Sequence, residues 1–369
     1  MAIYRIFPES DSFIFSEFPL SNAGKDEILE LGGYTDTSSI NRTSRILIKF
    51  NDDEITDVIE NKIAGSNWKS NLGLYLAEAS EIPTSFTIFT YPLSTNFVNG
   101  TGRFGDQPIN KTGVSWLYRN EQETEPWTTS SFITNETGSF QTSQPGGGTW
   151  FTGSSGISLE ASQSFNLNSE LDLLTDVTNI VSMSFNGDIT NNGLIVKLDE
   201  NTEFFTSSSV RLRYFGGDTN TIYPPFLEFK WDDSQYSVGS LSTLNNSQST
   251  ILVKNNKGEY PDEGKYRFRI HAKPTHPVRV FTTSSVYLTN YALPQNTYWG
   301  LRDEHSEEMI VDFDTDYTKV SCDSTGSYFD VYMEGLQPER YYRILLKSEL
   351  DGSTTVVDNN NVFKVVRNG

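Results

Sequence analysis

Short stretches in which apolar and polar residues alternate recur along this chain of 369 residues, and they limit its fold more than any other feature. In residues 44–50, SRILIKF, the apolar side chains of Ile46, Ile48 and Phe50 fall on one face, which is the pattern of a half-buried β-strand. Gly, Pro, Asn and Asp separate such stretches, and Thr and Ser are frequent, a composition that favours strands and turns over helices. Before residue 170 only residues 51–63 indicate a helix. The sequence therefore predicts an all-β fold.

The stretches before residue 240 predict one large antiparallel β-sandwich of the jelly-roll kind, with about ten short strands. Gly32-Gly33 is predicted to stop the third strand, and residues 171–181 are predicted as a short helix or turn that enters a strand. Residues 211–234 are predicted to close the sandwich as a hairpin. The predicted strands are 1–6, 11–18, 27–32, 44–50, 71–77, 86–91, 181–185, 192–198, 211–215 and a stretch that ends at Trp231.

Alternation resumes in the last third of the chain, where the short strands are typical of an immunoglobulin-like or fibronectin-like sandwich. Leu336-Gln337-Pro338 before Tyr341-Tyr342 indicates a turn into an aromatic strand, a common corner in such folds. The predicted strands here are 251–254, 266–270, 278–281, 298–301, 309–313, 327–333, 341–347 and 363–366. The sequence therefore predicts a jelly-roll-like domain at residues 1–240 with a long insertion at 119–170, a linker at 241–264 and an immunoglobulin-like domain at 265–369.

The charge balance argues against polyanionic partners. Lys and Arg number 28 against 48 Asp and Glu, which gives a net charge of −20. A surface this acidic repels phosphate backbones and anionic membranes, so neither nucleic acid nor a membrane is expected as a partner. No apolar stretch reaches the roughly 18 residues that indicate a membrane span.

The place of folding is predicted from the single cysteine and from the first residues of the chain. Cys322 has no partner for an internal disulfide, and the opening residues lack a basic start followed by an apolar run. Both features predict folding in a reducing cytosol without an export signal.

Two residue clusters could hold a metal ion, and each has a simpler interpretation. His271 and His276 flank a short loop, but no third ligand stands at a suitable spacing, so solvated imidazoles at a turn are preferred. Residues 312–316 contain three alternating aspartates that resemble the start of a calcium loop. Tyr317 and Asp323 occupy the positions where that loop needs Gly and a bidentate Glu. A solvated row of carboxylates is therefore preferred, and no metal, cofactor or catalytic residue is predicted.

The aromatic residues leave a glycan-binding alternative open. Trp127, Trp150 and Trp299 could form a sugar platform if they are exposed, but core or interface positions are preferred. A glycosidase would need two carboxylates that face each other across a cleft, and these can lie far apart in a sequence. Cys322 is predicted to be a buried, unreactive thiol.

The first domain resembles a widespread β-sandwich family of surface and fibrous proteins, the DNRLRE type. The strand 44–50 corresponds to its R-x-L-L-x-F motif, and the segment 192–197 corresponds to its N-x-G-L-x-L-K motif, with Lys197 in place. The other matches are Asn22, Gly24, Glu27–Gly32, Leu72–Leu76, Val114-Ser115-Trp116 and Asp176-Val177-Thr178 with Val181. The insertion at 119–170 is longer than the family pattern has there.

The whole chain is similar to virion structural proteins of large T4-like marine tailed phages, the cyanophage type. This resemblance rests on the segments 211–234, 266–270, 321–324, 337–342 and 363–367. It implies a non-enzymatic component of the particle that contacts copies of itself and other virion proteins.

These features together predict a viral structural protein that is synthesised in the bacterial cytoplasm and resides in the virion, at the tail, the baseplate or another exterior position. Edge strands and the excursion at 119–170 are its expected contact surfaces, and symmetric assembly as a homo-oligomer would add weak contacts together. The alternative is a carbohydrate-binding module or a protein that binds a host-surface glycan receptor, with a glycan hydrolase as its less favoured form.

Overall fold

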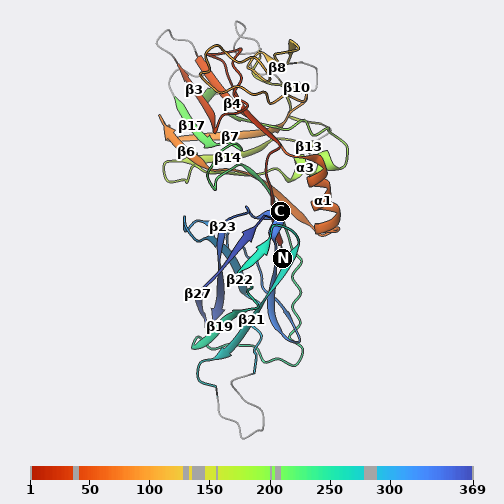
Figure 1. Ribbon diagram of the computed structural model, residues 1–369, viewed down its shortest axis with the longest axis vertical. Helices are drawn as coiled ribbons and strands as arrows, with labels where there is room; N and C mark the ends of the chain where they lie inside the picture. Colours follow the sequence, from red (N-terminus) through yellow and green to blue (C-terminus); the bar gives the residue numbers. More distant parts are fainter. Residues whose placement is uncertain are drawn as a thin grey trace. The chain divides into compact units, whose positions relative to one another are not determined.

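The computed structural model describes residues 2–35, 41–127, 133–134, 146–154, 157–199, 202–203, 209–277 and 289–367. Strands make up nearly all of the regular structure in these ranges, and almost all of them pair antiparallel (Figure 1). The predicted all-β sandwich class is therefore confirmed. Within the same ranges, no helix combines the length and the apolar character that crossing a bilayer requires.

The chain folds into two compact units. We call them the first sandwich, which comprises Ile6–Lys62 and Lys69–Glu228, and the second sandwich, which comprises Met1–Arg5, Ile63–Trp68 and Phe229–Gly369.

A curled eight-stranded sheet dominates the first sandwich, in the order β14–β7–β16–β4–β3–β17–β6, with β2 paired to β4. A four-stranded sheet has the order β1–β18–β5–β15. Ile46 and Ile48 of β4 are fully buried, as the alternation predicts. The strands of these two sheets are β1 (Ala2–Ile6), β2 (Ser10–Phe15), β3 (Ile28–Thr35), β4 (Asn41–Lys49), β5 (Trp68–Leu74), β6 (Leu76–Ser80), β7 (Ser85–Pro92), β14 (Ala161–Asn166), β15 (Leu173–Asp176), β16 (Leu194–Leu198), β17 (Val210–Phe215) and β18 (Phe226–Trp231).

The predicted hairpin at residues 211–234 is wrong. Strand β17 pairs with β3 along one edge and with β6 along the other, so no edge remains for β18. Strand β18 lies instead in the four-stranded sheet. The turn between them therefore carries the chain from one sheet to the other.

The prediction that Gly32-Gly33 stops a strand is also wrong, because β3 continues to Thr35. The two glycines serve close packing of the backbone. A Cβ atom on Gly32 would lie 2.7 Å from the carbonyl oxygen of Val210, and one on Gly33 would lie 2.9 Å from that of Thr202.

Two helical segments of the first sandwich compare differently with the prediction from the sequence. Residues 51–63 form helix α1 (Asp52–Asp57) and a π-helical turn, η1 (Val58–Ile63), as predicted. The strand predicted at 181–185 is instead part of helix α3 (Thr178–Phe185). Val177, Ile180 and Val181 are buried at helical spacing. Asp176 also accepts hydrogen bonds from the backbone and hydroxyl of Thr178, which starts the turn.

The outer face of the large sheet is covered by described residues of the segment 93–150, which follows β7 and which we call the excursion from here on. Trp116, Trp127 and Trp150 from this excursion pack against Leu47 of β4 and Ile195 of β16. The face of β4 that carries Arg45 and Leu47 is therefore buried under a layer of aromatic residues. Short strands brace the excursion and the segment after it: β8 (Tyr118–Asn120), β9 (Glu125–Pro126), β10 (Ile133–Thr134), β11 (Trp150–Phe151), β12 (Gly153–Ser154) and β13 (Ile157–Ser158).

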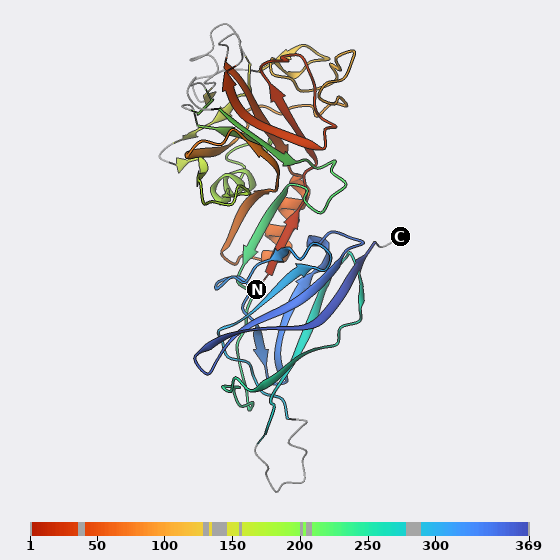
Figure 2. The same ribbon diagram turned by 90° about the vertical axis from the view of Figure 1, so that its left-hand side faces the viewer.

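The second sandwich has two sheets, β19–β21–β25–β24 and β20–β27–β26–β22–β23. In chain order this is the strand arrangement of an immunoglobulin-type sandwich. Strands β26 and β27 form a long hairpin, the dark blue pair in Figure 2. The strands are β19 (Ser249–Lys254), β20 (Glu259–Pro261), β21 (Lys265–Pro274), β22 (Thr297–Asp303), β23 (Met309–Val311), β24 (Ser321–Asp323), β25 (Gly326–Tyr332), β26 (Tyr341–Leu350) and β27 (Ser353–Val366), with a 3-10 turn, η3 (Met333–Gly335).

The core of the second sandwich explains two features of its sequence. Residues 241–264, predicted as a linker, supply β19 and β20, because Ile251 and Tyr260 are buried in this core. The predicted corner is present: the hydroxyl of Tyr342 in β26 donates a 2.9 Å hydrogen bond to the carbonyl oxygen of Gln337. The strand predicted at 278–281 lies outside the described residues.

Candidate functional site

The histidines and aspartates that could bind a metal do not converge. His271 lies within β21, where burial and then the nearby lysines lower its pKa, and His276 is exposed beyond the end of that strand. Asp314 accepts hydrogen bonds from the backbone N–H groups of Asp316 and Tyr317, at 2.7 and 3.0 Å, so its carboxylate caps a turn. Across the described parts of the chain, no three His, Cys, Asp or Glu residues are placed to hold a metal ion.

Asp323, the residue at the twelfth position of the calcium-like pattern, has a structural partner. Burial alone would raise its pKa, but hydrogen bonds from Thr325 and Arg269 outweigh that effect and lower the pKa to about 2. Its carboxylate is 2.8 Å from the guanidinium of Arg269. The neighbouring Cys322 is buried, as predicted, and burial raises the pKa of its thiol.

The three tryptophans considered for a sugar platform are all buried. Trp127 and Trp150 belong to the layer over the large sheet, and Trp299 lies in the core of the second sandwich. The preferred interpretation of these residues as core is therefore confirmed. An exposed platform built from them is excluded, because all three side chains are buried, and the rings of Trp150 and Trp299 lie against Tyr91 and Phe329.

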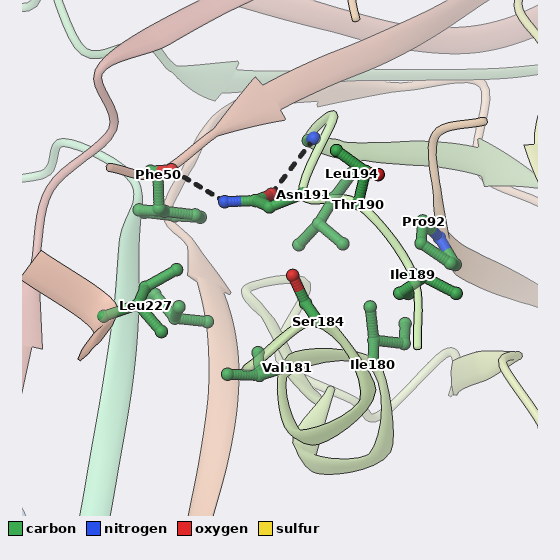
Figure 3. Close-up of a pocket in the computed structure, with 12 residues that line it drawn as sticks. Phe50, Pro92, Ile180, Val181, Ser184, Ile189, Thr190, Asn191, Leu194 and Leu227 are labelled. Carbon is green, nitrogen blue, oxygen red and sulfur yellow. Dashed lines mark hydrogen bonds between the residues drawn. The ribbon is translucent and has the colours of Figure 1, made fainter. Parts of the chain in front are cut away.

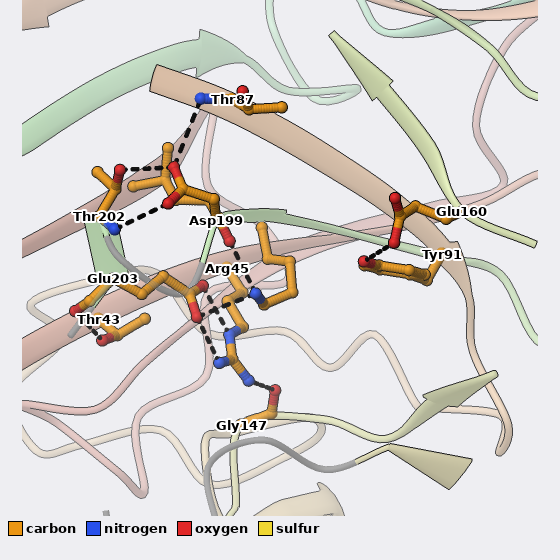
Figure 4. A network of polar contacts seen from close by, with 11 residues as sticks. Thr43, Arg45, Thr87, Tyr91, Gly147, Glu160, Asp199, Thr202 and Glu203 are labelled. Carbon is orange, nitrogen blue, oxygen red and sulfur yellow. Dashed lines mark hydrogen bonds and ion pairs between the residues drawn. The ribbon is translucent and has the colours of Figure 1, made fainter. Parts of the chain in front are cut away.

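The most unusual chemistry in the first sandwich is a buried group of three charged residues, Arg45, Lys197 and Glu203, which we call the charged triad. Figure 4 labels Arg45 and Glu203. The side chains of Arg45 and Glu203 are fully buried, and that of Lys197 is nearly so. Glu203 accepts hydrogen bonds from Arg45 Nε at 3.0 Å and from Nη2 at 2.7 Å. Lys197 Nζ lies 3.3 Å from the second carboxylate oxygen. The carboxylate therefore contacts both cations.

Further contacts fix the charged triad to the layer that covers it. Arg45 Nη1 donates a 2.6 Å hydrogen bond to the carbonyl oxygen of Gly147. The guanidinium carbon of Arg45 lies 5.3 Å from the ring centre of Trp116 and 5.2 Å from that of Trp150, within the range of cation–π attraction. Because these partners come from the excursion, the charged triad fastens that excursion to the sheet.

Sequence reasoning found two members of this group and missed the third. Arg45 and Lys197 stand in the two motifs that resemble the DNRLRE family, but Glu203 has no motif around it. A turn after β16 positions it: Asp199 accepts hydrogen bonds from Thr202, and the N–H of Glu203 donates to the carbonyl oxygen of Asp199 at 2.9 Å. The Asp-x-x-Thr spacing that caps this turn was the available signal.

A partly open cavity lies in the first sandwich between helix α3 and the ends of strands β16 and β18 (Figure 3). The space that the centres of water-sized molecules can reach is about 30 Å³, and the empty space that includes the solvent at its mouth is about 380 Å³. Most of the wall is hydrocarbon, and the hydroxyl of Ser184 points into the space. The principal wall residues are Phe50, Ile180, Val181, Leu194 and Leu227.

A cluster of aromatic residues reaches the surface of the first sandwich, and we call it the phenylalanine cluster. Phe18 and Phe104 are 46% and 39% exposed, and their ring centres are 5.7 Å apart. Phe13 and Phe15 lie beneath them, at 5.4 and 5.9 Å from Phe104. The exposed rings thus stand on a rigid buried base that β2 provides.

Comparisons with known proteins give no family. No family model and no curated protein matches the chain. Two solved structures align with 8% sequence identity and a TM-score of 0.17. One is a DUF4785 family protein from Legionella pneumophila, of which this chain covers 66% with 98% of its own length. The other is the binding domain of botulinum neurotoxin DC in complex with rat synaptotagmin II, covered to 68% by 96% of this chain.

Proposed function

We propose that this protein is a non-enzymatic structural component of a tailed phage particle, and that the phenylalanine cluster is a surface through which it contacts another subunit. The observation that carries the contact surface is the pair of exposed rings on a buried aromatic base. Aromatic residues are enriched in the energetic centres of protein interfaces, where a rigid ring buries much apolar area at little entropic cost.

The surroundings of the cluster fit this role. Arg211 stacks on the ring of Tyr34 at 3.9 Å, and the hydroxyl of Tyr34 donates a 2.6 Å hydrogen bond to Glu17. Tyr34 in turn lies 6.3 Å from Phe15. An apolar centre is therefore bordered by fixed polar groups, which is the usual anatomy of an interface.

The phage assignment rests on the resemblance in sequence, and the tail or baseplate is the position we favour. A chain of two antiparallel sandwiches suits a mechanical role, because each sandwich has its own core and presents loops and edge strands for contacts.

The proposal is tested by replacing both exposed rings, Phe18→Ser with Phe104→Ser, in a phage that encodes this chain. We expect the variant protein to fold, as judged by circular dichroism, and to be depleted from purified particles by at least tenfold. The matched control is Leu167→Ser, which removes a residue that is 71% exposed and outside the cluster. Normal incorporation of the double variant would refute the cluster as a contact surface.

A further inference from the structure

We propose that the cavity between α3 and the ends of β16 and β18 binds a small uncharged molecule that has an apolar body and one hydrogen-bonding group, such as an aromatic or branched aliphatic alcohol. This inference does not depend on the proposed structural role in a particle.

The wall of the cavity selects for an apolar body. Ile180 and Val181 extend from α3, while Leu194 and Leu227 face them from the sheets (Figure 3). Phe50, which directly follows β4, adds to the same wall. A ring or a branched chain placed among these side chains would exchange water contacts for hydrocarbon contacts. The helix and the strands fix the wall, so little ordering would be needed on binding.

The wall also offers a polar contact to a ligand. The hydroxyl of Ser184 points into the cavity, and Figure 3 draws no hydrogen bond from it to the other wall residues. Asn191 and Thr190 are the other polar residues of the wall, and the side chain of Asn191 is already committed. Its Nδ2 donates to the carbonyl oxygen of Phe50 at 3.0 Å and to Asp52 at 2.7 Å, and its Oδ1 accepts from the N–H of Gly193 at 3.2 Å. The hydroxyl of Ser184 is thus placed to make a directional contact with the ligand.

The charges near the cavity disfavour an ionised ligand. The carboxylate of Asp52 is held beside the wall through Asn191, and Asp53 and Glu54 share the first turn of α1. These groups and the overall charge of −20 repel an anion. A cation would have to leave its hydration shell for a hydrocarbon wall. A neutral ligand meets neither obstacle.

Three probes that share a phenyl ring test this preference for a neutral ligand on the full-length protein. They are benzyl alcohol, toluene and benzoate. Binding is measured by methyl NMR, through shifts of the Ile, Leu and Val methyl groups that line the cavity. We expect benzyl alcohol to bind with a dissociation constant of about 0.1–1 mM, a range typical of ligands of this size. Toluene should bind more weakly, and benzoate should bind at least tenfold more weakly than benzyl alcohol.

Substitutions in α3 locate the site. Ser184→Ala should weaken the binding of benzyl alcohol by about 3- to 10-fold, which corresponds to one hydrogen bond, and should leave the binding of toluene unchanged. Ser184→Leu should fill the cavity and abolish binding of both. Ser182→Ala, on the same helix but outside the wall, is the matched control and should change neither. Circular dichroism and the methyl spectrum of each variant report whether it folds.

Three results would overturn the proposal. They are the absence of shifts with both benzyl alcohol and toluene, shifts that Ser184→Leu does not abolish in a folded protein, and benzoate binding as tightly as benzyl alcohol.

Discussion

Replacing Glu203 with Gln tests the charged triad, because it removes one negative charge and leaves the shape of the side chain almost unchanged. Arg45 and Lys197 would then lose the carboxylate that they share, in a site that water does not reach. Removing one partner of a buried ion pair costs about 3–5 kcal/mol, since a charge stays buried without its counter-charge. We therefore expect the free energy of unfolding of the first sandwich to fall by this amount.

The measurement is urea unfolding monitored through hydrogen exchange of peptides from β4 and β16. These peptides report on the first sandwich separately from the second. The midpoint should fall by about 1–2 M urea. The control is Glu78→Gln, because Glu78 contacts Arg213 at a similar distance of 2.8 Å but both side chains are exposed. That change should cost less than about 1 kcal/mol.

A second substitution separates charge balance from packing. Lys197→Met leaves Arg45 and Glu203 as a neutral pair and keeps the hydrocarbon stem, so it should destabilise less than Glu203→Gln. Combined with Glu203→Gln, it should recover part of the loss. A cost below 1 kcal/mol for Glu203→Gln, or equal costs for the buried and the exposed pair, would refute the account of the charged triad.

Three other predictions concern single groups. Burial raises the pKa of Asp11 to about 6, although the N–H of Gly217 donates to it. Between pH 4 and 6 the folded state therefore keeps a proton that the unfolded state releases. The free energy of unfolding should fall by about 2–3 kcal/mol as the pH rises from 4 to above 6. In Asp11→Asn this decline should be absent from thermal unfolding curves, and an unchanged decline would contradict the assignment. Tyr342→Phe should cost about 1–2 kcal/mol in urea unfolding through loss of its bond to Gln337, and no loss would show that the corner is not needed. Asn51→Ala should cost about 1 kcal/mol, because Asn51 caps α1 through the N–H groups of its first turn. Increased exchange confined to α1 would support this result, and unchanged exchange would contradict it.

The strands of this protein are largely readable from its sequence, because the period of two places buried residues such as Ile46 and Ile48 on one face. The strand partners are not, because pairing depends on contacts between distant segments. Residues 211–234 have the composition of a hairpin, yet β17 finds both of its neighbours elsewhere in the chain. Gly32 and Gly33 are predicted from the sequence to end a strand, but they allow close packing of the backbone instead.

The candidate sites show the same limit. Arg45 and Lys197 are charged residues of two short strands, and the alternation in residues 44–50 predicts a solvated face for Arg45. The excursion that buries them lies about 50 to 100 residues away in the sequence. No pattern close to either residue predicts that it is covered. The cavity wall likewise draws on α1, α3 and three strands. The three tryptophans are predicted from the sequence to be core or interface residues. The sequence does not indicate which sheet face they cover.

The central claim is that this chain is a structural component of a particle, and quantitative mass spectrometry of purified phage tests it most directly. Heavy-labelled peptides of this chain and of a protein of known copy number would be measured in the same sample. We expect this chain at a fixed copy number per particle that survives washing in high salt. Its absence from purified particles, or a copy number that varies between preparations, would contradict the claim.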